Sequence, residues 1–237
     1  MSLQITQVVT PKEVYNIKCP YVMAASGIVV HDTANDASAM AEISYMLSNS
    51  NYTSFHFAVD DYRAVQGLPL DRNGWHAGDG TNGTGNRLGI GIEVCYSKSG
   101  GERYLKAREN AAELCAILLK ARGWGINKIA KHQDYSGKYC PHRNLDMGWN
   151  NFIALVQTKL DALNGKKPTP APQPAKIAVG DTVKVTGTSY ATGGTIPAWV
   201  KNTTHKVSQI KDDRALLGAP NGIMSWVLIK DIEKVAK

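Results

Sequence analysis

A chain of 237 residues is long enough for one sizeable hydrophobic core and a smaller module. Its 43% hydrophobic and 20% charged residues are ordinary for a globular protein, which excludes fibrous and disordered classes, and no apolar run is long enough for a membrane span. The net charge of +7 is concentrated in residues 176–237, with nine basic and five acidic side chains. This favours an anionic partner for that part. Without zinc-finger spacing or an arginine stripe, we do not expect nucleic acid.

The first residues lack a basic segment followed by an apolar stretch, so we expect no secretory signal and synthesis in a cytosol. Four cysteines are present, and in that compartment we expect them to be thiols. Cys95, in a strand pattern, and Cys115, in a helix pattern, are predicted core residues. Cys19 has no clear assignment, and Cys140 stands in a metal-like context.

Strand and helix patterns alternate over the first two thirds of the chain. We predict an irregular arm over 1–25, strands over 27–31, 54–60, 62–70 and 90–96, a long loop over 71–89, and helices over 36–47 (with Asp36 as its cap), 102–122 and 150–163. This order predicts an α/β fold in which helices flank a mixed central sheet.

Residues 165–175 carry proline at every second position, which predicts an extended linker. It separates a predicted catalytic domain over 1–164 from a small domain over 176–237. Strand patterns at 177–185 and 223–229 predict that the small domain is an all-β barrel of SH3-like type. Its candidate exposed aromatic residues, any of which could instead belong to the core, are Tyr190, Trp199 and Trp226.

The stretch from His132 to His142 combines metal-ligand residue types with helix breakers. Gly137 and Pro141 predict a loop of fixed shape, and His132 with Cys140 is a zinc-type ligand pair. The best third ligand is His31, at the end of a short buried strand. Three protein ligands would leave a fourth position for water, as in catalytic metal sites. Taken alone, His31 could equally be a core-edge histidine without a metal.

Five motifs occur in order along residues 5–163. They are Ile28-Val-Val-His31, Ser54-Phe-His-Phe-Ala-Val-Asp60, Trp75-His-Ala-Gly-Asp79, Gly91-Ile-Glu-Val-Cys-Tyr-Ser97 and His132 through Cys140-Pro-His142. Through these motifs the chain resembles the zinc-dependent N-acetylmuramoyl-L-alanine amidases of the type-2 amidase and peptidoglycan-recognition fold, in particular phage endolysins of Gram-positive bacteria. The resemblance implies a Zn²⁺ cofactor bound by His31, His132 and Cys140. It also implies hydrolysis of the amide bond between N-acetylmuramic acid and L-alanine in peptidoglycan.

Two residues are candidates for catalysis. Glu93 interrupts an apolar strand, where a carboxylate is costly unless it faces a groove or a partner, so it is our candidate general base. The resemblance places a catalytic glutamate there, although strand alternation alone also allows an outward-facing residue. Lys138, two residues before Cys140, could stabilise an oxyanion, as the resemblance implies, or be a solvated loop lysine.

Three further residues are candidates for substrate binding. Trp75 and His76, on the glycine-rich loop, are a plausible wall for a sugar or a peptide stem. His56, in the middle of a strand, is expected to support the groove rather than bind metal. His142, next to the Cys140-Pro pair, is a candidate hydrogen-bonding neighbour of the site. The glycines between Gly80 and Gly91 lack the phosphate-loop pattern.

Two alternatives to the amidase remain open. A non-catalytic peptidoglycan receptor on the same fold characteristically lacks the cysteine ligand, which this chain keeps as Cys140. A zinc peptidase would use the same site on a bond within the stem peptide. For the amidase, we expect peptidoglycan as substrate and a cell-wall polymer as the ligand of residues 176–237. A phage or prophage lysis enzyme without a signal would be made in the host cytoplasm and reach the wall after release through a separate membrane pore.

Overall fold

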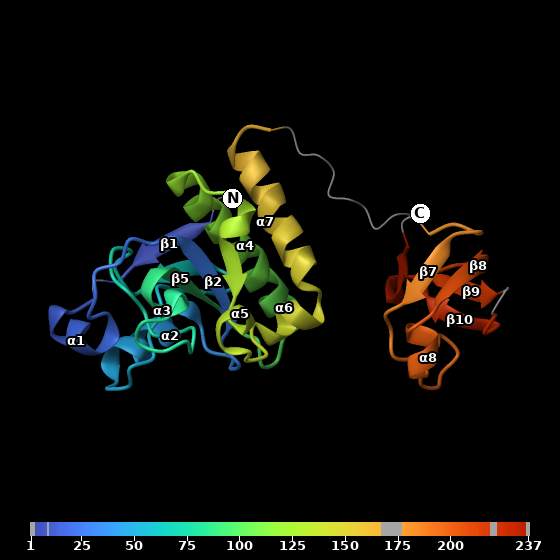
Figure 1. Ribbon diagram of the computed structural model, residues 1–237, viewed down its shortest axis with the longest axis horizontal. Helices are drawn as coiled ribbons and strands as arrows, with labels where there is room; N and C mark the ends of the chain where they lie inside the picture. Colours follow the sequence, from blue (N-terminus) through green and yellow to red (C-terminus); the bar gives the residue numbers. More distant parts are fainter. Residues whose placement is uncertain (1–2, 9, 167–176, 219–221, 236–237) are drawn as a thin grey trace. The chain divides into compact units, whose positions relative to one another are not determined.

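The computed structural model describes residues 3–8, 10–166, 177–218 and 222–235. The chain forms two compact units, Met1–Ala171 and Pro172–Lys237 (Figure 1). The predicted linker 165–175 lies almost wholly outside the described residues. The boundary between the two units, after Ala171, falls within the residue range of this predicted linker.

The N-terminal unit contains a six-stranded sheet with the strand order β1-β4-β3-β5-β2-β6. Among the described strand pairs of this sheet, only β3–β4 is antiparallel, so the predicted mixed sheet is confirmed. The strands are β1 (Gln4–Gln7), β2 (Gly27–Asp32), β3 (Phe57–Val59), β4 (Arg63–Gln66), β5 (Gly89–Val94) and β6 (Ile129–Lys131).

Helices cover both faces of this sheet (Figure 1). The two long ones, α4 (Gly101–Arg122) and α7 (Trp149–Leu163), pack against each other, and α4 ends at Gly123, whose φ of 65° is left-handed. Helix α2 (Ala39–Ser48) packs on β3 and β4. The shorter helices are α1 (Tyr15–Lys18), α3 (Thr84–Leu88), α5 (Gln133–Ser136), α6 (His142–Asp146), and the 3-10 turns η1 (Lys12–Val14) and η2 (Ile126–Lys128).

Alternation along the central strands separates the core from the site. Val30 of β2 is paired with Ile92 of β5, and both side chains lie in the hydrophobic core. The next pair in the register is His31 with Glu93, which therefore points to the opposite face. Adjacent residue pairs of the same two parallel strands thus lie on opposite faces of the sheet: Val30 and Ile92 in the core, and His31 and Glu93 on the face of the site.

Several short elements were not predicted. The arm over 1–25 is not wholly irregular, because β1 pairs in parallel with β4 at the sheet edge and α1 follows it. The loops over 71–89 and 132–142 contain α3 and α5, and β6 was missed as well. These segments are three to five residues long, too short to show a hydrophobic period, and the strands β1 and β6 in addition depend on partner strands far away in the sequence.

Two local predictions are wrong in detail. The strand predicted over 54–60 is restricted to Phe57–Val59, because Ser54 forms only an isolated bridge with Trp75. The cap of α2 is Ser38, whose side chain accepts a hydrogen bond from the Ala41 amide at 3.3 Å. Asp36 instead accepts hydrogen bonds from the backbone and hydroxyl of Ser99, so it ties two loops together.

The C-terminal unit is built on a five-stranded antiparallel sheet with the order β10-β9-β8-β7-β11, which confirms the predicted β architecture. The SH3-like assignment stays a prediction. The elements are β7 (Thr182–Val185), α8 (Ala198–Lys201), β8 (Thr204–Lys211), β9 (Arg214–Gly218), β10 (Ser225–Leu228), the 3-10 turn η3 (Ile229–Asp231) and β11 (Ile232–Lys234). Of the three aromatic candidates, Trp199 is 57% exposed, Trp226 is half-buried and Tyr190 packs against the core.

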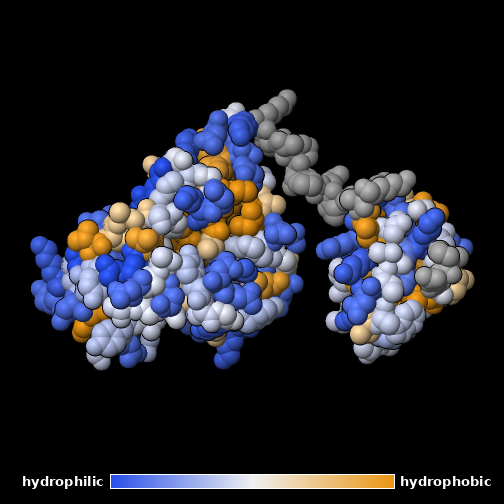
Figure 2. Space-filling model, viewed as in Figure 1, coloured by the Kyte–Doolittle hydropathy of each residue, from blue (hydrophilic) through white to orange (hydrophobic). Residues whose placement is uncertain are grey.

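The four cysteines are free thiols, as predicted, and all four are buried. Cys95 and Cys115 belong to the N-terminal core, as expected, and so does Cys19, which the sequence left unassigned. Among the described helices, none combines the length and apolarity needed to cross a membrane. Polar residues cover most of the face shown in Figure 2, with apolar patches on the first unit near α7.

Candidate metal centre and active site

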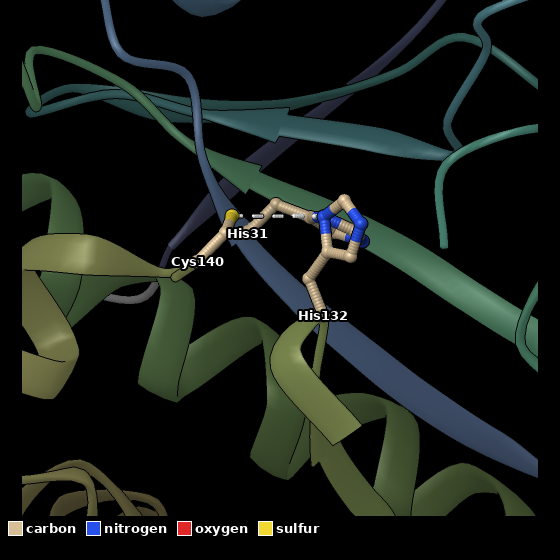
Figure 3. Close-up of side chains that lie close together, drawn as sticks. All are labelled: His31, His132 and Cys140. Atoms are coloured by element: carbon tan, nitrogen blue, oxygen red, sulfur yellow. Dashed lines mark hydrogen bonds between the residues drawn. The ribbon is translucent and has the colours of Figure 1, made fainter. Parts of the chain in front are cut away.

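Three residues from distant parts of the chain converge at one edge of the sheet (Figure 3). His31 is the penultimate residue of β2, and His132 follows β6 directly. Because β2 and β6 are parallel neighbours, their carboxyl ends lie at the same edge. Cys140 reaches the same point from the loop after α5. The structure therefore brings together the three residues predicted as metal ligands.

The ligand atoms are spaced for a small ion. His31 Nδ1 lies 2.9 Å from His132 Nδ1 and 4.0 Å from Cys140 Sγ, and one donor atom of each residue lies within 4.8 Å of the others. Tetrahedral zinc with ordinary bond lengths separates its ligand atoms by about 3.3–3.6 Å. All three residues are buried, with exposed fractions of 1% for His31, 7% for His132 and 4% for Cys140. Two imidazoles and one thiol at this spacing fit a zinc ion.

Burial keeps all three ligands uncharged when no cation balances them. It lowers the pKa of His31 well below its usual value, with the neighbouring His76 and His132 acting in the same direction. Burial also lowers the pKa of His132 and raises that of the Cys140 thiol to about 12. A divalent cation reverses this for the cysteine, since coordinated thiols are deprotonated.

The ligand loop is closed by its own backbone. The helical turn α5 ends at Gly137, whose φ of 75° requires the left-handed region that glycine tolerates. The Gln133 amide then donates to the Cys140 carbonyl at 3.0 Å, which returns the end of the loop to its start. This closure places His132 and Cys140 side by side although seven residues separate them.

His76 contacts the ring nitrogen of His31 that does not face His132. His31 Nε2 lies 3.1 Å from His76 Nδ1, and His76 Nε2 lies 3.2 Å from the Gly89 carbonyl oxygen. Since that carbonyl only accepts, His76 donates from Nε2 and its Nδ1 accepts from His31. Burial lowers the pKa of His76 to about 3, so the ring is neutral. The His76 ring rests on Gly91, where an added Cβ would come within 2.6 Å of it.

Glu93 lies beside the ligands with a side chain 15% exposed. Its Oε1 is 4.0 Å from His31 Nδ1, and within the described part of the chain its Oε2 has no hydrogen-bond partner. Burial raises the pKa of this carboxyl to about 8, helped by the carboxylates of Glu42 and Asp32 and opposed by Lys138. An unpaired carboxyl with a pKa near neutrality is suited to transfer protons.

These side chains line a pocket of about 270 Å³, hereafter the metal pocket. His31, His76, Glu93, His132, Lys138 and Cys140 are among its lining residues. Lys138 is exposed at the rim, and α2 contributes the opposite wall through Glu42, Tyr45 and Met46.

Two acidic residues of the site were not predicted. The Oε1 of Glu42 is buried and, among the described residues, has no hydrogen-bond partner. Asp32 is also buried: it accepts from the Arg143 amide at 2.8 Å and from the Tyr104 hydroxyl at 3.1 Å, and so fixes the chain after Cys140. Asp32 had a usable signal, a charge directly after a buried strand. Glu42 had none, since it lies on a helix with several polar positions.

The remaining predicted site residues lie around the metal pocket rather than in it. His56 is buried, its Nδ1 accepts from the Gly91 amide at 3.0 Å, and its Nε2 donates to the Arg72 carbonyl at 2.9 Å. Both ring nitrogens are thus engaged with backbone, which fits the expected supporting role and leaves no free donor or acceptor for substrate. Trp75 lines a neighbouring groove. His142 Nε2 lies 3.2 Å from the Ser97 carbonyl oxygen.

Comparison with known proteins places this site in context. A family model described as N-acetylmuramoyl-L-alanine amidase matches residues 21–143. Over 167 residues the chain is 54% identical to the N-acetylmuramoyl-L-alanine amidase CwlA of Bacillus subtilis (strain 168), covering 70% of this chain and 61% of that protein. Over 194 residues it is 50% identical to the amidase XlyB of the same organism, covering 80% and 61%. The chain thus spans about three fifths of the length of these curated relatives.

A solved structure is similar over the N-terminal unit. The solution structure of the PlyG catalytic domain matches with a TM-score of 0.65 and 48% sequence identity, covering 72% of this chain and 100% of that domain.

Proposed function

The chain belongs to the N-acetylmuramoyl-L-alanine amidase family, and from this premise we propose that it is a zinc-dependent hydrolase of peptidoglycan. The bond that it cleaves is the amide between the lactyl group of N-acetylmuramic acid and the L-alanine of the stem peptide. The observation that carries the proposal is the convergence of His31, His132 and Cys140 beside the carboxyl of Glu93, whose Oε2 has no hydrogen-bond partner among the residues that the structure describes.

His31, His132 and Cys140 would hold the zinc ion, and the chemistry that zinc supplies in such a site is acidification of water and polarisation of a carbonyl. Glu93 accepts a proton from the attacking water and passes it to the nitrogen of the leaving amine as the C–N bond breaks. Burial raises the pKa of Glu93 to about 8, and with a cation held by the three ligands this pKa would be lower, which suits both halves of the proton transfer.

Lys138 acts on the other side of the carbonyl. Lys138 is one of the residues that line the metal pocket, and it lies two positions before Cys140. It donates to the carbonyl oxygen as negative charge develops there.

His76 positions His31 for this chemistry. The chain of hydrogen bonds from His31 through His76 to the Gly89 carbonyl keeps the proton of His31 on Nε2 and leaves Nδ1 free for a metal. His76 therefore acts through His31 rather than as a substrate-binding residue.

The test is digestion of purified Gram-positive cell wall followed by mass spectrometry and end-group analysis. We expect new L-alanine amino termini and no new reducing sugar ends. New amino termini at other residues would instead identify a stem-peptide peptidase. Binding of wall without release of any fragment would identify a non-catalytic receptor. Metal content is measured on the same protein, and we expect about one zinc per chain.

We further propose that the C-terminal unit binds an anionic cell-wall polymer. Lys211, Arg214 and Trp226 line one pocket of this unit together with Thr192 and Asp212, so its lining carries two cations, one carboxylate and an aromatic ring. The two cations attract a polyanion in a salt-dependent way. The protein would then act as a phage or prophage endolysin, made in the host cytoplasm and delivered to the wall at lysis.

This second part is tested by sedimentation of the full chain with purified walls. Replacing Lys211 and Arg214 together by glutamine is expected to reduce the bound fraction several-fold at low salt and to weaken its salt dependence. The matched control replaces Lys230 and Lys234 in the same way, because these residues lie outside that pocket and remove the same charge. Equal losses in the two variants would contradict a specific pocket.

A further inference from the structure

A single residue, Asp32, connects two of the three candidate metal ligands. It follows the ligand His31 at the end of β2, and its side chain is 0% exposed. Its backbone amide donates a hydrogen bond to Cys140 Sγ at 3.5 Å. Asp32 is therefore joined covalently to His31 and by an N–H···S hydrogen bond to Cys140, although these two ligands lie 109 positions apart in the chain.

The carboxylate of Asp32 also holds the segment that follows Cys140. Its Oδ2 accepts from the Arg143 amide at 2.8 Å, and its Oδ1 accepts from the Tyr104 hydroxyl at 3.1 Å. Arg143 lies in α6, close after Cys140, whereas Tyr104 lies in the long helix α4. Because each carboxylate oxygen has its own donor from a different element, the side chain of Asp32 is fixed in one orientation.

Helix α4 holds the same segment at a second point. Arg108 lies one helical turn after Tyr104, so the two side chains leave α4 on the same face. The Nε of Arg108 donates to Asn144 Oδ1 at 2.7 Å, and both of these side chains are buried. Since α4 has 22 residues and packs along α7, it is a stable support. The start of α6, directly after Cys140, is thus tied to this support through Asp32 and through Asn144.

This support matters most for the sulfur ligand. His31 lies within β2 and His132 directly follows β6, so the sheet itself places both histidines. Cys140 lies in a loop and depends on neighbouring contacts for its position. The Asp32 amide adds a second effect, because a hydrogen bond to a thiolate stabilises the negative charge that the sulfur carries when it binds a metal. Partners of this kind behind metal ligands typically change metal affinity 10- to 100-fold.

We propose that Tyr104 and Asp32 are positioning residues of the metal centre. The Tyr104 hydroxyl fixes the carboxylate of Asp32, and Asp32 in turn sets the sulfur of Cys140 against the two histidines. Tyr104 is 1% exposed and is not among the described residues that line the metal pocket, so it acts through Asp32 and not by contact with the metal or the substrate. This inference rests on the proposed function, because that function supplies the zinc ion.

The test is Tyr104→Phe in the full chain, which keeps the buried ring and removes only the hydroxyl. We expect the zinc affinity, measured by competition with a chelator, to fall about 10-fold. In cobalt-substituted protein we expect the thiolate-to-cobalt charge-transfer absorption to shift or to lose intensity, because this absorption reports on the bond between sulfur and metal. A merely structural role would lower the unfolding midpoint of the metal-free protein and leave the cobalt spectrum unchanged.

Two further variants and a control sharpen this test. In Asp32→Asn, the amide oxygen can still accept from the Arg143 amide and the NH₂ group can donate to the Tyr104 oxygen, so we expect the cobalt spectrum to be retained. Asp32→Ala removes both bonds and is expected to lose that spectrum. The matched control is Tyr96→Phe, since Tyr96 is also a buried tyrosine, 4% exposed, and does not line the metal pocket. Circular dichroism checks that each variant keeps the fold.

The outcomes separate this inference from the amidase proposal. An unchanged zinc affinity and cobalt spectrum in Tyr104→Phe, or equal changes in Tyr96→Phe, would overturn the positioning role even when the unaltered chain binds zinc and releases L-alanine termini. If the unaltered chain binds zinc and Tyr104→Phe weakens it, but wall digestion releases no such termini, the amidase function fails and the positioning role stands. An unaltered chain that binds neither zinc nor cobalt would overturn both.

Discussion

The two units bury histidine in different ways. In the C-terminal unit, His205 lies in β8, and its Nε2 is 2.8 Å from the Val200 carbonyl oxygen and 3.1 Å from the Thr203 hydroxyl. In the N-terminal unit, His31 faces His132, His76 and Cys140. The Nε2 of His205 is thus held by backbone and a hydroxyl of its own unit, while its buried Nδ1 has no hydrogen-bond partner among the described residues. His31, His132 and Cys140 instead face one another, in an arrangement that a cation can occupy. The partners of a buried histidine therefore indicate whether it has a structural role or is a candidate metal ligand.

Among the variants considered, Cys140→Ser is expected to have the largest effect on the metal centre of the N-terminal unit. We expect bound zinc and wall digestion to be lost together, with a rate at least about 10³-fold lower, because both the metal's transition-state stabilisation and one of its three ligands are removed. The measurements are metal content and L-alanine release. His205→Gln is the control and is expected to keep both. A full lytic rate in Cys140→Ser would show that the metal assignment is wrong.

Replacing Glu93 by glutamine separates proton transfer from metal binding. We expect kcat to fall about 10²- to 10⁴-fold while the zinc content is retained, because the amide of glutamine cannot accept the proton. Glu109→Gln is the matched control, since Glu109 is a glutamate on the surface of α4 with a side chain 52% exposed. An unchanged kcat in Glu93→Gln would remove Glu93 from the mechanism.

The same variant tests the raised pKa of Glu93 in metal-free protein. Below its ordinary pKa of 4.5 the carboxyl is protonated in both the folded and the unfolded state, so the two proteins differ least. Between 4.5 and the raised value of about 8, only the unfolded state ionises, so the unaltered protein loses stability as the pH rises.

We therefore expect Glu93→Gln to gain relative stability across this range, levelling off above about pH 8 at roughly 5 kcal/mol at most, since the pKa rises from 4.5 to about 8 and each pKa unit is worth about 1.4 kcal/mol. Urea unfolding at pH 4, 6 and 8.5 measures the difference. A difference that does not change with pH would contradict the raised pKa.

The smallest expected effect concerns His76. His76→Ala is expected to weaken zinc binding about 10- to 100-fold, because His31 loses the acceptor that orients its ring. His76→Asn, which can place an oxygen near the former Nδ1, is expected to recover part of this affinity. Competition with a chelator measures both variants. An unchanged zinc affinity in His76→Ala would show that the contact between the two histidines is not used.

Much of the site could be predicted because its signals are local. The spacing of His132 and Cys140, with Gly137 and Pro141 between and beside them, indicates a closed loop, and His31 ends an apolar run. Glu93 is an isolated charge in a strand. Each of these signals depends only on residue type and near neighbours. The part that Glu42 has in the metal pocket could not be predicted in this way, because its surroundings come from another strand and another loop.

The sequence by itself indicated the longer helices and the central strands, a division of the chain into two parts and the three residues predicted to bind a metal, because hydrophobic periodicity, proline content and ligand spacing are properties of neighbouring residues. Only the tertiary structure decided which polar groups meet. The parallel register that sets His31 beside Glu93 and the support of His31 by His76 each depend on contacts between segments far apart in the chain. Such contacts are set by how the sheet is paired and covered, and no local pattern records them.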